Sequence, residues 1–178
     1  MIVTYAQIDG FKNLKNISFV PDRKYNIIVG HNAQGKTNLL EAMWIMSGCR
    51  SFRGSKEKDY ISLDGNRMSS KIRIRDSVRE QKISFEMSKS SAPQKILHVN
   101  GVKQKGTKSL FEVFKCIAFT PDDVEIVKGS PERRRSFIDM AASQLNPLFV
   151  LHVSKHSAVM NQRNALLKEI MKDRKSVV

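Results

Sequence analysis

Residues 25–37, YNIIVGHNAQGKT, contain the pattern that decides the fold of this chain. The second part, GHNAQGKT at residues 30–37, matches G-x-x-x-x-G-K-[ST] at every position. The apolar segment YNIIV before it reads as a central strand, while Leu39, Leu40 and Met43 behind it recur at helical spacing from near Gly35. A strand, a glycine-containing loop and a helix in this order predict a loop that wraps around phosphate groups.

The residue types of this loop suit a nucleoside triphosphate, and we expect ATP. Glycines let the backbone approach the phosphates, and the helix amino terminus supplies N–H donors and partial positive charge. Lys36 adds a full charge toward the β- and γ-phosphates, and the Thr37 hydroxyl is the predicted ligand of Mg²⁺. The loop residues expected to contact the nucleotide are Gly30, His31, Asn32, Ala33, Gln34, Gly35, Lys36, Thr37 and Asn38.

The remaining pattern predicts an α/β fold in two parts, residues 1–129 and residues 130–178. Residues 2–8 and 17–20 read as strands, and alternating apolar and polar residues from 67 to 102 predict an antiparallel layer with a hairpin turn at Asn100-Gly101. Residues 116–119 read as another buried strand, and Pro121 as the start of a helix. Longer helices are predicted from residue 130 toward residue 144 and from residue 147 to near the end.

The chain is strongly basic, with 31 Lys and Arg residues against 17 Asp and Glu residues and a formal net charge of +14. Six lysines and one acid, Glu112, lie between residues 89 and 115, so much of the excess lies outside the phosphate loop. A chain this basic typically works beside a polyanion, and nucleic acid is the expected partner. The alternative is a solvated basic face that has no partner.

The sequence also indicates the cellular compartment of the protein. No apolar run approaches the roughly 20 residues of a membrane span, and the amino terminus lacks the order of a signal peptide, so we expect a cytoplasmic protein. Cys49 and Cys116 stand alone in apolar neighbourhoods, which favours buried thiols over a disulfide or a metal site.

Hydrolysis requires a carboxylate at the end of a second apolar strand to hold Mg²⁺, and the sequence offers no convincing one. Asp122 and Asp123 follow a run that Thr120 and Pro121 interrupt, and Asp139 lies in a helical pattern. We therefore assign no catalytic residue and expect the chain to bind ATP with half of a catalytic site.

Four segments together resemble the RecF family of bacterial DNA replication and repair proteins. They are GHNAQGKTNLLEA (30–42), GCRSFRG (48–54), FTPDDVEIVKGSPERRRSFIDMAASQLNP (119–147) and NQRNALLK (161–168). The resemblance implies an ABC-type ATPase head related to SMC proteins, with residues 1–129 as the head lobe and residues 130–178 as the beginning of a helical arm. It also implies ATP-dependent dimerisation and DNA binding at single-strand gaps, acting with RecR and RecO to load RecA during recombinational repair and the SOS response.

The resemblance assigns further residues around the nucleotide. The loop containing Phe11, Lys12 and Asn13 would touch it, with Lys12 near phosphate, and the basic residue near the γ-phosphate would be Arg50 or Arg53. A glycine is more usual at Ala33, whose methyl group should fit if φ is negative there.

The signature loop, the second Mg²⁺-binding carboxylate and its neighbouring glutamate lie beyond Val178 in the family. We therefore expect a truncated chain with little ATPase activity, taken from a parent that is a weak DNA-stimulated ATPase. Asp122 and Asp123 fall where the family has its glutamine loop, but no glutamine stands there.

Three arginines, Arg133, Arg134 and Arg135, point in different directions about 100° apart on one helix. We expect one or two to pair with acids such as Asp139, four residues after Arg135, and the rest to be available to DNA; a purely structural role is the alternative. Two other functions stay open: a small P-loop phosphotransferase, and a basic DNA-binding module with a vestigial loop.

Overall fold

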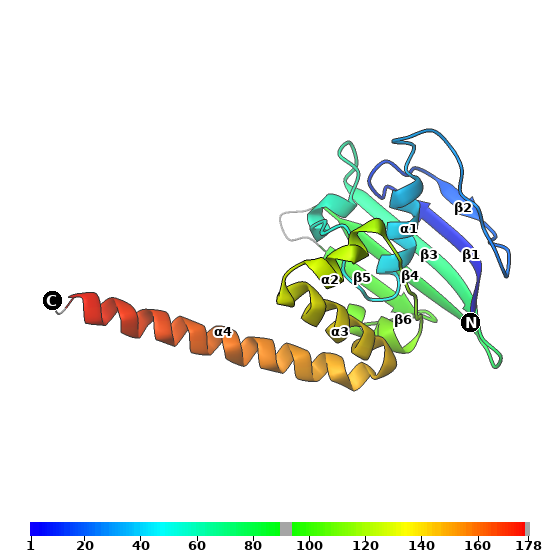
Figure 1. Cartoon of the computed structure of the whole chain (residues 1–178). Coiled ribbons are helices and arrows are strands. Elements are labelled where there is room, and N and C mark those ends of the chain that lie inside the picture. Colours follow the sequence, from blue (N-terminus) through cyan, green and yellow to red (C-terminus); the bar gives the residue numbers. More distant parts are fainter. Residues whose placement is uncertain (90–93, 177–178) are drawn as a thin grey trace. The chain divides into compact units, whose positions relative to one another are not determined.

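The computed structural model describes residues 1–89 and 94–176, with side chains as far as Met171. The chain divides into two compact units, Met1–Thr120 and Pro121–Val178. This division falls nine residues before the boundary expected from the sequence. The first unit contains the sheet and the phosphate loop, and the second contains the long helices (Figure 1).

Six described strands form one antiparallel sheet in the order β2-β1-β3-β4-β5-β6. Its strands are β1 (Ile2–Asp9), β2 (Ile17–Phe19), β3 (Arg67–Arg75), β4 (Glu80–Ser88), β5 (Gln94–Val99) and β6 (Val102–Lys103). Apolar side chains alternate with exposed polar ones along β3 and β4, as expected for a sheet with one buried face. The predicted antiparallel layer is therefore confirmed, and β1 and β2 join it.

The hairpin predicted at Asn100-Gly101 joins β5 to β6. Both residues have positive φ, 52° and 82°, which matches the twist of the two strands. The Asn100 side chain also accepts a hydrogen bond from the Lys82 backbone N–H at 2.8 Å, and this contact fixes the turn against β4.

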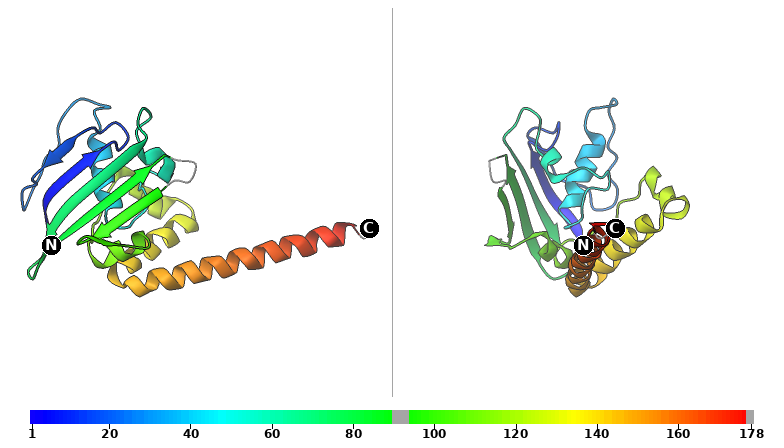
Figure 2. Two further views of the ribbon diagram at one scale, coloured as in Figure 1. Left: turned by 180° about the vertical axis from the view of Figure 1, so that it is seen from behind. Right: turned by 90° about the vertical axis from the view of Figure 1, so that its left-hand side faces the viewer.

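Helix α1 (Lys36–Ile45) covers one face of this sheet (Figure 2). Ala42, Trp44 and Ile45 of the helix are buried with the inward residues of the strands, such as Ile72 and Phe85. The 3₁₀ helices η1 (Glu57–Tyr60) and η2 (Thr107–Glu112) also belong to this unit, and their Tyr60, Leu110 and Phe111 side chains are buried. The helix predicted to begin near Gly35 is confirmed, with Gly35 as its N-cap.

Two predicted strands are wrong. Residues 25–29 and 116–119 are extended but belong to no strand, and most of their large apolar side chains face solvent. Ile27 is 87% exposed, Val29 82% and Phe119 93%. An apolar segment becomes a strand only when a neighbouring strand takes up its backbone hydrogen bonds, and the described residues offer these segments no such neighbour.

The second unit is helical. It contains η3 (Pro121–Val124), α2 (Glu125–Lys128), α3 (Pro131–Leu145) and α4 (Pro147–Ser176), as the sequence predicts. Ser130 is the N-cap of α3 and Pro131 its first residue, which is the position where proline loses no hydrogen bond. None of the helices in the described residues is both long and apolar enough to cross a membrane.

The arginine cluster behaves differently from expectation. In the described residues Arg135 and Asp139 form no ion pair, while Arg134 donates from Nη1 to the backbone carbonyls of Val127 and Gly129, both at 3.2 Å. A cation at the carboxy end of a helix satisfies carbonyls that have no partner within the helix. Arg134 therefore has a structural role that joins α2 to α3.

Candidate nucleotide-binding site

The phosphate loop depends on three positive backbone angles. Gly30 has a φ of 152°, Ala33 of 65° and Gly35 of 96°. Ala33 does not meet the condition of a negative φ under which its methyl group was expected to fit, because it takes the left-handed conformation, which costs a residue with a Cβ roughly 1–2 kcal/mol. The glycine that is more usual there would avoid this cost.

The Lys36 ammonium lies over its own loop. Its Nζ donates to the backbone carbonyls of Gly30 at 2.8 Å and His31 at 2.7 Å. These two bonds use two of its three N–H groups and hold the ammonium against the backbone carbonyls of the loop. Phosphate oxygens, as charged acceptors, would compete with these neutral carbonyls for the same ammonium.

The amino-terminal loop packs directly on Gly35. A Cβ at Gly35 would lie 2.7 Å from Asn13 Oδ1 and 2.8 Å from Leu14 Cδ2, so only glycine fits. Asn13 Nδ2 donates to the Ala33 carbonyl at 3.1 Å and Asn13 Oδ1 accepts from Asn38 Nδ2 at 2.7 Å. The residues following β1 thus fix the shape of the phosphate loop.

Arg53 extends this chain of contacts. Its Nη1 donates to Asn38 Oδ1 at 2.9 Å and lies 3.8 Å from Glu41 Oε2. Three segments distant in sequence therefore meet beside the loop: residues 12–13, the first turns of α1, and residues 51–55. Among the described residues the Arg50 guanidinium forms no ion pair, and its backbone carbonyl accepts a hydrogen bond from Trp44 Nε1 at 2.7 Å.

Glu41 is the residue that sequence reasoning missed. Its side chain is 0% exposed, and its carboxylate accepts from Lys12 Nζ at 2.5 Å and from Ser51 Oγ at 2.5 Å. Lys12 itself is 17% exposed in its side chain and also donates to Ser55 Oγ at 2.8 Å. A buried carboxylate needs such partners, and the clue in the sequence was an acid one residue before the buried Ala42 and three before Trp44.

The segment carrying Arg53 is held by buried polar contacts. Ser51 Oγ accepts from the backbone N–H groups of Arg53 at 3.1 Å and Ser55 at 3.2 Å. The Tyr60 hydroxyl accepts from the Ser51 backbone N–H at 3.2 Å, and burial raises the pKa of this hydroxyl, so it stays neutral. Hydrogen bonds to both the backbone and the side chain of Arg53 therefore fix its position.

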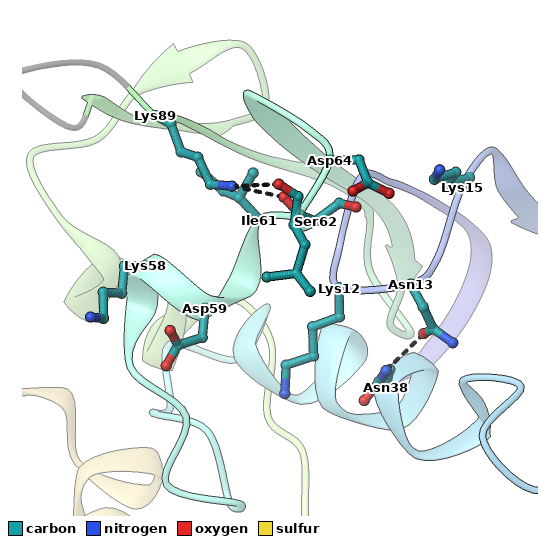
Figure 3. A pocket seen from close by; sticks show the side chains of 11 residues that line it. Lys12, Asn13, Lys15, Asn38, Lys58, Asp59, Ile61, Ser62, Asp64 and Lys89 are labelled. Atoms are coloured by element: carbon teal, nitrogen blue, oxygen red, sulfur yellow. Dashed lines mark hydrogen bonds between the residues drawn. The ribbon is translucent and has the colours of Figure 1, made fainter.

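A cavity of about 950 Å³ opens beside this network. It shares three residues with the network, Lys12, Asn13 and Asn38 (Figure 3). Four lysines and two acids are among its lining residues, which are Lys12, Asn13, Lys15, Asn38, Lys58, Asp59, Ile61, Ser62, Leu63, Asp64 and Lys89. Lys89 Nζ closes one wall by donating to the Ser62 carbonyl at 2.8 Å.

The other predicted contact residues lie in or next to the loop. His31, Asn32, Gln34 and Thr37 are exposed, and Thr37 is the second residue of α1. The part of the chain that the structure describes has no cluster of three or more His, Cys, Asp and Glu side chains able to hold a metal ion. A Mg²⁺ ion here would therefore rely on the Thr37 hydroxyl, the phosphates and water.

Known proteins resemble this chain over most of its length. A family profile described as AAA ATPase domain matches residues 1–177. The chain belongs to this family. The AAA ATPase domain here is also 34% identical over 170 residues to the DNA replication and repair protein RecF of Lachnoclostridium phytofermentans, covering 96% of the chain and 47% of that protein. The RecF of Desulforamulus reducens is 36% identical over 171 residues, covering 96% of the chain and 44% of its own length.

Solved structures give the same result for the fold. A structure of the recombination mediator protein RecF-ATPrS in the RecFOR pathway superposes with a TM-score of 0.87 at 35% identity, covering 94% of this chain and 45% of that one. The SMC head domain from Thermotoga maritima has a TM-score of 0.52 at 17% identity, over 65% of this chain and 43% of its own, and supports the fold alone. The predicted resemblance to RecF and the SMC-like head fold are confirmed, and the chain spans about half the length of these relatives.

Proposed function

We propose that this AAA ATPase domain chain binds Mg-ATP at residues 30–38 as the amino-terminal part of a RecF-type protein that binds DNA during recombinational repair. By the same resemblance, it would act at single-strand gaps with RecO and RecR to promote RecA loading, as an ATP-dependent homodimer in the cytoplasm. The relatives named RecF and the RecF structure solved with a nucleotide analogue support this proposal.

The observation that carries the proposal is the hydrogen-bonded chain from the Ala33 carbonyl through Asn13 and Asn38 to Arg53. It links the Arg53 guanidinium to the phosphate loop that carries Lys36. These two cations suit a triphosphate, whose charge they would neutralise, whereas the Lys12 ammonium is paired with the buried Glu41 carboxylate. Thr37 would ligate Mg²⁺, which supplies charge neutralisation between the phosphates.

The neighbouring cavity provides room for the rest of the nucleotide. A volume of about 950 Å³ lies within the range of small-molecule sites, roughly 300–1,000 Å³. Because Lys12, Asn13 and Asn38 line both the cavity and the loop network, a nucleotide with its phosphates on the loop would place its nucleoside toward this cavity.

Calorimetric titration of the protein, with its carboxy-terminal half present, tests the proposal. Lys36→Ala should weaken Mg-ATP binding by about 1.5–3 kcal/mol, or roughly 10- to 150-fold, because it removes charged hydrogen bonds to phosphate. Lys24→Ala, at an exposed lysine before the loop, is the matched control and should bind normally. Equal affinities for Lys36→Ala and the control would contradict the proposal.

Assays on the same protein distinguish the proposed function from its two alternatives. A small phosphotransferase would consume ATP steadily with a small acceptor, whereas we expect little turnover without a second carboxylate. A DNA-binding module with a vestigial loop would bind DNA equally with and without Mg-ATP, whereas we expect Mg-ATP to increase DNA retention.

A further inference from the structure

The outward face of the sheet carries an unusual arrangement of charge. In the described part of residues 1–120, α1 and the buried side chains occupy one face only, and the opposite face has no helix over it (Figure 2). Two neighbouring rows of outward residues cross the strands. The first row, from β2 to β6, is Ser18, Gln7, Lys71, Ser84, His98 and Lys103, and the second is Tyr5, Arg73 and Lys82.

These two rows contain basic residues and no acid. Arg73 and Lys82 are direct partners in the β3–β4 register, so two positive side chains stand opposite each other. Arg73 also lies over the Tyr5 ring, 5.2 Å from its centroid. Lys71 and Lys82 are exposed, and neither pairs with an acid anywhere in residues 1–89 and 94–171, whose side chains the structure describes.

The acidic residues of this face either have a bonding partner or lie outside the two basic rows. Glu80 is paired with Arg75 at 2.9 Å, and the Arg75 guanidinium lowers the pKa of Glu80. Both side chains therefore stay charged, and the net charge of the pair is zero. Asp9 accepts a hydrogen bond from the Asn16 backbone N–H at 2.9 Å, and Glu86 lies in the row of Asp9, next to the first row. The two basic rows therefore keep their positive charge.

This arrangement has a cost in the isolated sheet. Like charges directly opposite each other on neighbouring strands are destabilising. Neither Arg73 nor Lys82 forms an ion pair in the described part of the face, and the acid nearest to both along the strands, Glu80 in the next row, is itself paired with Arg75. An anionic partner would turn this repulsion into attraction. Neighbouring strands lie about 4.8 Å apart, so Lys71 on β3 and Lys103 on β6 are roughly 14 Å apart across a flat surface.

We propose that this face, defined by Lys71, Arg73, Lys82 and Lys103, binds the phosphate backbone of duplex DNA without reading its sequence. The proposal rests on the DNA-binding function proposed above and assigns a surface to it. Duplex DNA is favoured over a single strand because single strands bind through exposed aromatic platforms on which bases stack. The two rows have no Phe or Trp, their single Tyr, Tyr5, is covered by Arg73, and His98 is the one other ring in them.

The test compares two double variants of the protein with its carboxy-terminal half present. Lys71→Gln/Lys82→Gln removes two charges from the face, and Lys24→Gln/Lys115→Gln removes two exposed charges from outside the two rows. Binding of a 30-base-pair duplex is measured from 0.05 to 0.3 M salt. Each phosphate contact contributes about 0.9 to the slope of log K against log salt, so the face variant should lose about 1.8 from the slope.

At 0.1 M salt this change corresponds to a loss of affinity on the order of 60-fold for the face variant, with the control variant unchanged. Lys71→Arg/Lys82→Arg should restore both slope and affinity, and equal urea midpoints would show that the face variant is folded. Equal slopes for the face and control variants would overturn the proposal. So would a loss of single-strand binding with duplex binding intact.

Mg-ATP titration separates this proposal from the proposed nucleotide function. The face variant should bind Mg-ATP as tightly as the unaltered protein, since none of its residues touches the phosphate loop. If the unaltered protein fails to bind Mg-ATP while the slope difference persists, the nucleotide function fails and the DNA face stands. If Mg-ATP binds normally and the slope difference is absent, the face alone fails.

Discussion

Breaking the buried pair between Lys12 and Glu41 should strongly destabilise the first unit. Lys12→Met keeps the length of the side chain and removes its charge. Removing one partner of a buried ion pair costs about 3–5 kcal/mol, because the other charge stays buried without compensation. Glu41 would keep the Ser51 hydroxyl as a donor and the Arg53 guanidinium at 3.8 Å, and Lys12 is 17% exposed, so we expect about 3 kcal/mol, the lower end of that range.

Urea unfolding followed by tryptophan fluorescence measures this cost. Trp44 is the single tryptophan of the chain and is 3% exposed on α1, so its emission reports on the unit that contains the pair. With a urea m-value of about 2 kcal/mol/M, a loss of about 3 kcal/mol lowers the midpoint by about 1.5 M. Lys15→Met, at an exposed lysine of the same loop, should shift the free energy of unfolding by no more than about 0.5 kcal/mol.

A double-variant cycle decides whether the cause is the unpaired carboxylate. Glu41→Gln in the Lys12→Met background removes the buried charge, so it should recover part of the lost stability. The coupling between the two sites should exceed about 1 kcal/mol, as for residues in direct contact. Equal midpoints for Lys12→Met and Lys15→Met, or no recovery in the double variant, would refute this reasoning.

Three further predictions follow from single positions. Ala33→Gly should stabilise the loop by roughly 1 kcal/mol, because glycine adopts the φ of 65° without strain, and tighter Mg-ATP binding in calorimetry would show it; an unchanged affinity would contradict it. Burial raises the pKa of Cys116 to about 11 and also raises that of Cys49, so alkylation at pH 8 should be on the order of 100-fold slower than for free cysteine and should rise toward pH 10. A rate that levels off below pH 9 would refute it. Ile27→Lys should reduce self-association of the chain in light scattering, with Ile27→Val as the unchanged control, because Ile27 is an exposed part of an apolar segment.

Local patterns in the sequence were enough to predict much of the fold. The conformations of the phosphate loop and α1 depend on residues within a few positions of one another. The alternation of apolar and polar residues in β3 and β4 shows that one face of these strands is buried. The Asn100-Gly101 turn needs only its own two backbone angles. These elements were predicted because neighbours in sequence determine them.

The wrong predictions depend on contacts that are distant in sequence. Residues 25–29 have the composition of a strand, yet a strand also requires a partner, and the described residues supply none. The Ala33 carbonyl accepts a hydrogen bond from Asn13, twenty residues away, and the local sequence does not show this contact. Glu41 was assigned no role from the sequence, and only the approach of Lys12 and Ser51 shows it to be a buried carboxylate beside the loop.

The segment immediately before the phosphate loop is the less constrained end of that loop. The loop is fixed at one end by α1 and Asn13, whereas residues 25–29 at its other end form no ladder hydrogen bonds with any described strand. A strand added along YNIIV would hold this second end and restrict the loop. Linkage then requires that strand addition and nucleotide binding strengthen each other by the same factor. The lifetime of bound nucleotide would thus report whether residues 25–29 have gained a partner strand.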